Sequence, residues 1–227
     1  MAQAPRTPLE ELGVLASQEV EIDSGLSHLE LYTMRGLLTV LWHGPPDADR
    51  VVVACGGAMG GLLGPAGGLY HDLGRHLAGQ GIATLRVGYR RPNDLDMCTI
   101  DLAAAAEMAC RRGGGAVIAM GHSFGGAPAV RLGAMYPEVV AGVVTLATQS
   151  AGCEPAELLA CPLLMFHGDA DTILPPAASE MVRFLAGQGE LVLLAGAGHL
   201  LTEAAEEIRT RLYEWVPATL GAAARKE

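Results

Sequence analysis

The fold is decided by the stretch AVIAMGHSFGG, residues 116–126. Its first five residues are apolar and typical of a strand that is buried on both faces. Residues 124–136 predict a helix, since Pro128 falls in the first turn, where proline is tolerated. The chain must therefore turn sharply at Ser123, between Gly121 and Gly125, which lack the Cβ atoms that would collide in so close an approach.

A turn of this kind presents the Ser123 hydroxyl at its tip, in a strained backbone conformation. The N–H of Phe124 would point the same way from the start of a helix, where unpaired donors and the helix dipole favour negative charge. These are the features of a nucleophile elbow. The alternative is a glycine-rich turn with an incidental serine, and the pentapeptide alone does not decide between the two.

The composition favours one enzyme-sized domain and argues against some partners. The 227 residues are half apolar, 18% are charged, and the net charge is −10. Such an acidic chain is not expected to bind nucleic acid or an anionic membrane surface. We expect an N-terminal leader over residues 1–18, with a short helix at 9–17, followed by a single domain over 19–227. The oligomeric state is not predicted.

The cysteines and the apolar runs bear on location. There are five cysteines, an odd number, and no two have the spacing of a CxxC site, so we expect reduced thiols and a cytoplasmic protein. No apolar run reaches the ~18 residues of a membrane span, and the first residues lack the pattern of a secretory signal. The sequence predicts neither a metal site nor a cofactor.

Strands and helices alternate along most of the chain. We predict strands at 19–23, 28–43 (a hairpin that turns at 35–36), 50–54, 82–87, 116–120, 139–148, 162–166 and 190–194, and helices at 67–80, 94–111, 124–136, 176–186 and 200–220. This order predicts an α/β fold, a three-layer α/β/α sandwich with a mostly parallel central sheet of about eight strands. Ligands bind such sheets at the carboxyl ends of the strands, so the residues after each strand are candidates for a site.

Three strand ends together supply a nucleophile, an acid and a base. Ser123 follows one strand, the stretch His-Gly-Asp-Ala-Asp at 167–171 follows another, and His199 follows the last. A serine hydroxyl is a poor nucleophile until an imidazole accepts its proton. The imidazole in turn needs a carboxylate that fixes its tautomer and stabilises its charged form. We therefore expect these side chains to meet at one edge of the sheet.

Two further strand ends are candidates for binding roles. Residues 55–61 read CGGAMGG, a backbone with few side chains that could direct N–H groups at an oxyanion. The lysine and hydroxyl of a Walker phosphate loop are absent, and the alternative is a flexible surface loop. After the strand at 82–87 come Tyr89 and Arg90. The arginine could bind a substrate carboxylate, or it could pair with Asp94, Asp96 or Asp101.

The sequence resembles the α/β-hydrolase family in three motifs, which span roughly residues 50–215: Gly-His-Ser-Phe-Gly-Gly at 121–126, His-Gly-Asp-Ala-Asp at 167–171, and Gly-His at 198–199. The resemblance implies that Ser123 is the nucleophile, His199 the base and Asp171 the acid, with Asp169 a secondary carboxylate. Lidless carboxylesterases and dienelactone-hydrolase-like members are the most similar, because only about a dozen residues, 149–161, stand where relatives insert a cap.

The resemblance also implies an oxyanion hole and a reaction. One donor would be the amide of Phe124, and the other the amide of Gly57, with Ala58 as the alternative. Cys55 stands where the family commonly has histidine, and we expect it to be a buried, inert thiol. Ala58, Tyr89 and Arg90 are candidate substrate-binding residues.

The expected activity is hydrolysis of a small-molecule carboxylic ester or thioester through an acyl-enzyme. The alternatives are an acyltransferase with the same triad and a non-catalytic binding protein of the same fold.

Overall fold

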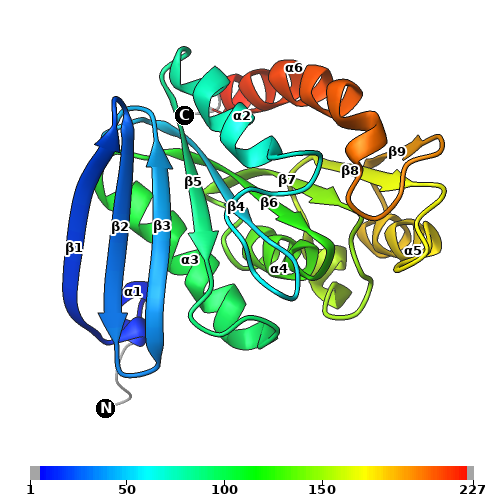
Figure 1. Ribbon diagram of the computed structural model, residues 1–227. Coiled ribbons are helices and arrows are strands. Elements are labelled where there is room, and N and C mark those ends of the chain that lie inside the picture. The colour runs from blue at the N-terminus through cyan, green and yellow to red at the C-terminus, as the bar shows by residue number, and fades with distance from the viewer. Residues whose placement is uncertain (1–5, 224–227) are drawn as a thin grey trace.

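One nine-stranded sheet runs through the protein, which we describe from a computed structural model over residues 6–223 (Figure 1). The strand order is β1-β2-β3-β5-β4-β6-β7-β8-β9. The strands are β1 (Val14–Asp23), β2 (Leu26–Thr33), β3 (Gly36–His43), β4 (Arg50–Cys55), β5 (Ile82–Gly88), β6 (Ala116–His122), β7 (Val140–Leu146), β8 (Leu163–Gly168) and β9 (Glu190–Leu194). The chain thus has the α/β fold with a mostly parallel sheet that the sequence predicts.

The six neighbouring strands β5, β4, β6, β7, β8 and β9 are parallel to one another. Strands β1, β2 and β3 each pair antiparallel with the next strand in the sheet. All residues of β6 and β8 are buried, and so are all residues of β4 except the first. This burial on both faces explains why these strands read as continuous apolar runs rather than as alternating ones. The parallel register brings the ends of β4, β6, β8 and β9 to one edge of the sheet.

Helices cover both faces of the sheet, giving the three-layer sandwich (Figure 1). One face packs against α2 (Leu69–Ala78) and α6 (Ala205–Ala223), and the other against α1 (Pro8–Leu12), α3 (Leu95–Arg111), α4 (Gly126–Met135) and α5 (Ala177–Ala186). Between β7 and β8 the chain forms only a short 3-10 helix, Glu154–Leu158. In the residues described, no cap domain lies over the sheet.

The N-terminal segment differs from the prediction. Residues 1–5 lie outside the described part of the chain. The predicted helix at 9–17 is wrong beyond Leu12, because Gly13 adopts a left-handed conformation (φ 60°) that ends α1. Strand β1 begins at Val14, so the end of the predicted leader belongs to the sheet. Every residue of β1 is exposed, and it is pairing with β2 rather than burial that makes it a strand.

The passage from β6 to α4 depends on glycine. A Cβ atom on Gly121 would overlap the carbonyl group of Gly125, and one on Gly125 would overlap the carbonyl group of Gly56. A Cβ atom on Gly126 would overlap the side chain of Thr148, which follows β7. The turn into α4 therefore packs against the backbone of Gly121 and Gly56 and against the side chain of Thr148, and these contacts fix the position of Ser123.

Replacing Gly121 by alanine should destabilise the protein by about 1–3 kcal/mol or more, because the new methyl group meets backbone that cannot move aside. Gly221→Ala is the matched control. It also lies in a regular element, a Cβ atom there meets nothing within 4 Å, and the change should be stabilising by about 0.5–1 kcal/mol. Urea unfolding at constant pH measures both. Equal stability of Gly121→Ala and wild type would contradict the close contact.

Candidate active site

The side chains of Ser123, His199 and Asp171 form a hydrogen-bonded chain at the carboxyl edge of the sheet. The Ser123 Oγ lies 2.9 Å from His199 Nε2, and His199 Nδ1 lies 2.7 Å from Asp171 Oδ2. Ser123 has a φ of 55°, a left-handed conformation that is strained for a residue with a side chain. The fold thus brings together the three predicted residues, of which Ser123 and His199 are 76 positions apart in the sequence.

Asp171 receives hydrogen bonds on both carboxylate oxygens. The N–H groups of Ile173 and Leu174 donate to Oδ1 at 2.8 and 2.9 Å, while Oδ2 accepts from His199. Burial by itself raises the pKa of the Asp171 carboxyl, but the bonds from Leu174, His199 and Ile173 outweigh it and hold the pKa below the ordinary value of 3.8. The side chain is fully buried, so Asp171 is a charged group held entirely by protein donors.

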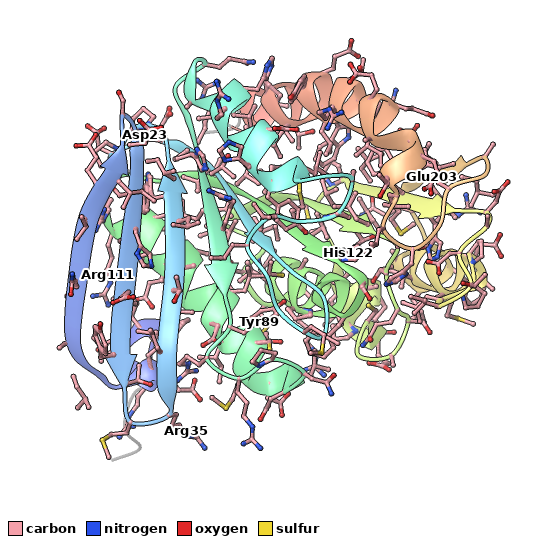
Figure 2. All side chains as sticks on the ribbon, in the orientation of Figure 1. Asp23, Arg35, Tyr89, Arg111, His122 and Glu203 are labelled. Atoms are coloured by element: carbon pink, nitrogen blue, oxygen red, sulfur yellow. The ribbon has the colours of Figure 1, made fainter. Side chains whose placement is uncertain are left out.

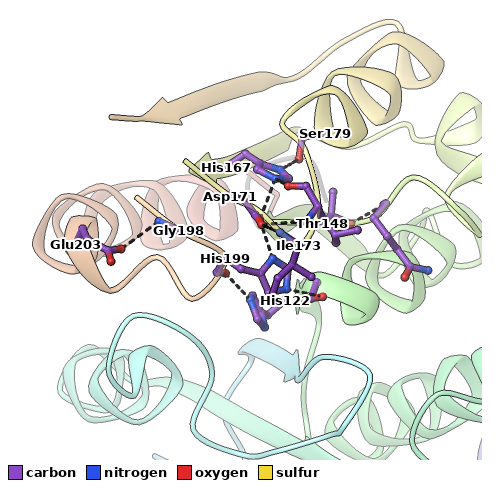
Figure 3. A network of polar contacts seen from close by, with 12 residues as sticks. His122, Thr148, His167, Asp171, Ile173, Ser179, Gly198, His199 and Glu203 are labelled. Carbon is purple, nitrogen blue, oxygen red and sulfur yellow. Dashed lines mark hydrogen bonds and ion pairs between the residues drawn. The ribbon is translucent and has the colours of Figure 1, made fainter. Parts of the chain in front are cut away.

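His122, next to the nucleophile position, was not singled out from the sequence. Its Nε2–H donates to the backbone carbonyl of His199 at 3.0 Å, and the two rings lie 5.0 Å apart (Figure 3). Burial lowers the pKa of His122 to about 4, so its ring is neutral at pH 7. This bond ties the end of β6 to the loop that carries His199. No periodicity or spacing in the sequence indicates it.

Behind Asp171 lies a second group that the sequence did not assign. His167 Nε2 is 3.0 Å from the carbonyl of Leu174 and 3.3 Å from Asp171 Oδ2, and His167 Nδ1 is 2.6 Å from Ser179 Oγ (Figure 3). His167 and Ser179 are both completely buried. His167 belongs to the motif at 167–171, which was the only signal for it; nothing in the sequence pointed to Ser179.

The glycine loop after β4 lies against Ser123. A Cβ atom on Gly57 would stand 3.4 Å from the Cβ of Ser123. The loop then closes in a tight turn, in which the N–H of Gly60 donates to the carbonyl of Gly57 at 2.8 Å. Ala58, within this turn, is partly buried against the same core cluster as Phe124. Gly57, one of the two predicted oxyanion residues, therefore lies beside the Ser123 side chain.

Tyr89 supports that loop instead of facing a ligand. Its hydroxyl donates to the carbonyl of Gly56 at 3.0 Å, its ring packs edge-to-face on Phe124, and the residue is 7% exposed. Burial raises the pKa of the Tyr89 hydroxyl, which therefore stays protonated as a donor. Tyr89 was predicted to contact substrate, but its side chain is buried and holds the glycine loop. Figure 2 shows Tyr89 and His122 in the interior, whereas Asp23, Arg35 and Arg111 lie at the periphery.

Arg90 is also a structural residue. Its Nε lies 2.5 Å from Asp101 Oδ1, its N–H donates to Asp101 Oδ2 at 2.8 Å, and both side chains are almost fully buried. Arg90 is thus held against Asp101 inside the protein, contrary to its predicted role in substrate binding. The pair joins the end of β5 to α3, and this was the alternative that the sequence left open.

Cys55 is buried, as predicted. Its Sγ lies 3.5 Å from the carbonyl of Met120 and 3.4 Å from that of Gly125, and no part of the residue is exposed. Burial raises the pKa of the Cys55 thiol to about 12, so it stays protonated and is a poor nucleophile.

Comparison with known proteins identifies the fold. Est1E from Butyrivibrio proteoclasticus superposes with a TM-score of 0.74 at 16% identity, covering 86% of this chain and 99% of that one. A dienelactone hydrolase from Anabaena variabilis gives 0.73 at 20% identity, covering 90% and 99%. An alpha-beta serine hydrolase homologue from Coxiella burnetii gives 0.68 at 20% identity, covering 82% and 95%.

No protein-family model and no curated protein matches the chain. The structural likenesses establish the α/β-hydrolase fold. No described helix is long and apolar enough to cross a membrane.

The lowered pKa of Asp171 makes a prediction about stability. A carboxyl whose pKa is lower in the folded protein stabilises the fold above its unfolded pKa, and this contribution is lost as the pH falls through the folded pKa. The difference in unfolding free energy between wild type and Asp171→Asn should therefore shrink as the pH falls below about 4.

Chemical denaturation between pH 7 and pH 2.5 measures that difference. Glu214→Gln is the control, because it removes an exposed carboxylate from α6 and should leave the pH dependence unchanged. A constant difference between wild type and Asp171→Asn over the whole range would contradict the assignment.

Proposed function

We propose that the protein is a serine hydrolase that cleaves a small-molecule carboxylic ester through an acyl-enzyme. The observation that carries the proposal is the unbroken chain from Ser123 Oγ through the His199 imidazole to the buried Asp171 carboxylate, at 2.9 and 2.7 Å. Solved structures that resemble this fold include those of Est1E, a dienelactone hydrolase and a monoacylglycerol lipase, and this likeness supports ester chemistry.

In the proposed reaction, Ser123 attacks the acyl carbonyl while His199 Nε2 accepts the hydroxyl proton. Asp171 holds the tautomer with hydrogen on Nδ1 and stabilises the imidazolium. His199 then gives the proton to the leaving alcohol, which departs and leaves the acyl group on Ser123. A water molecule, deprotonated by His199, cleaves the acyl-enzyme and restores the serine.

The tetrahedral oxyanion would be held by the amides of Phe124 and Gly57. Each such donor contributes about 2.7–4 kcal/mol in other serine hydrolases. The support for Gly57 is its position beside the Ser123 Cβ and the rigidity of its turn, which the Tyr89 hydroxyl holds through Gly56. A cytoplasmic location belongs to the same proposal and is supported by five free cysteines.

The proposed substrate carries an apolar group. Three large apolar side chains on the loops of the site are exposed: Met59 by 93%, Ile173 by 68% and Leu200 by 61%. Met59 stands two residues from Gly57, Ile173 two from Asp171, and Leu200 next to His199. Two residues span at most about 7.6 Å between Cα atoms. Large apolar side chains gathered on loops around one site favour an apolar ligand. Arg90, which would have favoured an acidic substrate, is engaged by Asp101.

Ser123→Ala should lower the turnover of p-nitrophenyl butyrate on the order of 10⁶-fold, because the triad acts as a unit. Ser24→Ala, a change of an exposed serine distant in the fold, is the control and should behave as wild type. A fluorophosphonate should label wild type and Ser24→Ala but not Ser123→Ala. Similar turnover in Ser123→Ala and wild type would overturn the proposal.

The apolar residues predict a dependence on acyl chain length. Replacing Met59 and Ile173 by serine should lower kcat/KM for a p-nitrophenyl octanoate about tenfold, the effect of losing ~1.4 kcal/mol of apolar contact. The rate with the acetate should hardly change, since its acyl group is too short to reach them. Phe184→Ser, which removes a 79% exposed side chain from α5, is the control. Parallel losses for both esters would contradict an apolar acyl site.

A further inference from the structure

The polar groups behind Asp171 are more completely buried than the triad itself. His167 and Ser179 have no exposed surface, yet they come from different elements, the end of β8 and the first turn of α5. Burying an imidazole and a hydroxyl is unfavourable unless each finds its partners. Here the partners are each other, the carbonyl of Leu174 and the carboxylate of Asp171 (Figure 3).

The acceptors around His167 determine where its proton lies. Nε2 faces two oxygens that can only accept, the Leu174 carbonyl at 3.0 Å and Asp171 Oδ2 at 3.3 Å, so Nε2 carries the hydrogen. In the neutral ring Nδ1 is then an acceptor, and the Ser179 hydroxyl at 2.6 Å donates to it. Ser179 thus supplies the donor that satisfies Nδ1 in the tautomer of His167 that carries its hydrogen on Nε2.

We propose that Ser179 and His167 are positioning residues for the reaction, which fix the Asp171 carboxylate in the orientation that holds His199. The inference rests on the proposed function. The N–H groups of Ile173 and Leu174 hold Oδ1, and His167 acts on the same loop, because its Nε2–H donates to the carbonyl of Leu174 while the ring nitrogen lies 3.3 Å from Oδ2. This bond to the Leu174 carbonyl holds the loop after β8 in the position from which the N–H groups of Ile173 and Leu174 reach Asp171.

The arrangement also sets how strongly Asp171 acts on His199. The positive end of the His167 Nε2–H dipole lies 3.3 Å from Oδ2 and offsets part of the carboxylate charge, so its loss leaves more of that charge to act on the His199 Nδ1–H and favours the imidazolium. The titratable groups that face one another here are His122, His167, Asp171 and His199, from the ends of β6 and β8 and the loop after β9. Removing the His167 donor should therefore move the acid limb of activity to higher pH.

The test compares four variants with p-nitrophenyl butyrate. Ser179→Ala and His167→Leu should lower kcat on the order of tenfold with little change in KM, and should shift the acid limb of kcat/KM to higher pH. His167→Gln, whose amide N–H occupies the place of Nε2–H, should restore most of the rate and the wild-type limb. Thr84→Val, which removes a buried hydroxyl on β5, is the control and should change neither.

A purely structural role gives a different result. If Ser179→Ala and His167→Leu lose thermal stability while kcat and the acid limb stay at wild-type values, the proposal is overturned. Ser179→Ala alone decides should His167→Leu not fold.

A second measurement does not need turnover. The His199 Nδ1–H hydrogen bond to Asp171 should give a far-downfield proton resonance that is displaced or lost in Ser179→Ala but kept in Thr84→Val. An unchanged resonance in Ser179→Ala would contradict the positioning role. Absence of turnover and of fluorophosphonate labelling in wild type would count against the proposed function alone.

Discussion

The contact between Gly121 and Gly125, where no Cβ atom can be accommodated, is the constraint on which the site depends. It lets α4 begin immediately after β6, and it forces Ser123 into a left-handed backbone conformation. Such a conformation typically costs about 1–3 kcal/mol, so the surrounding packing must hold it. That packing is the contact of Gly125 with the backbone of Gly56 and of Gly126 with the side chain of Thr148. The same contacts that hold the serine thereby position the glycine loop beside it.

A second constraint is the charge on Asp171. A buried carboxylate is stable only when donors replace its water, and here two backbone amides and two imidazoles surround it. Each donor comes from the loop after β8 or from a strand end beside it. The loop is therefore shaped around the carboxylate, and the position of His199 follows from the shape of the loop. The reacting groups and the fold are stabilised by the same hydrogen bonds.

The sequence predicted the parallel core and the order of Ser123, Asp171 and His199 because both depend on short local patterns. Apolar runs such as 116–120 are long enough to identify a strand, and each site residue stands in the loop or turn that follows one. Strand β1 could not be predicted in full, since its residues are exposed and only pairing with β2 orders them. The partner of Tyr89 was out of reach, because tertiary packing brings Gly56 to it, and for Arg90 the sequence offered Asp101 only as one of three possible partners.

Tyr89 and Arg90 show why position at a strand end does not by itself indicate contact with a ligand. The carboxyl edge of a parallel sheet has to bind substrate, but it also has to hold several loops that have no regular hydrogen bonding of their own. Tyr89 holds the glycine loop, and Arg90 joins β5 to α3. His122 and His167 serve the loops that carry His199 and Asp171. The side chains of Met59 and Ile173 stand two residues from Gly57 and Asp171 and remain exposed, so we infer their contact with a ligand from exposure and not from position at a strand end.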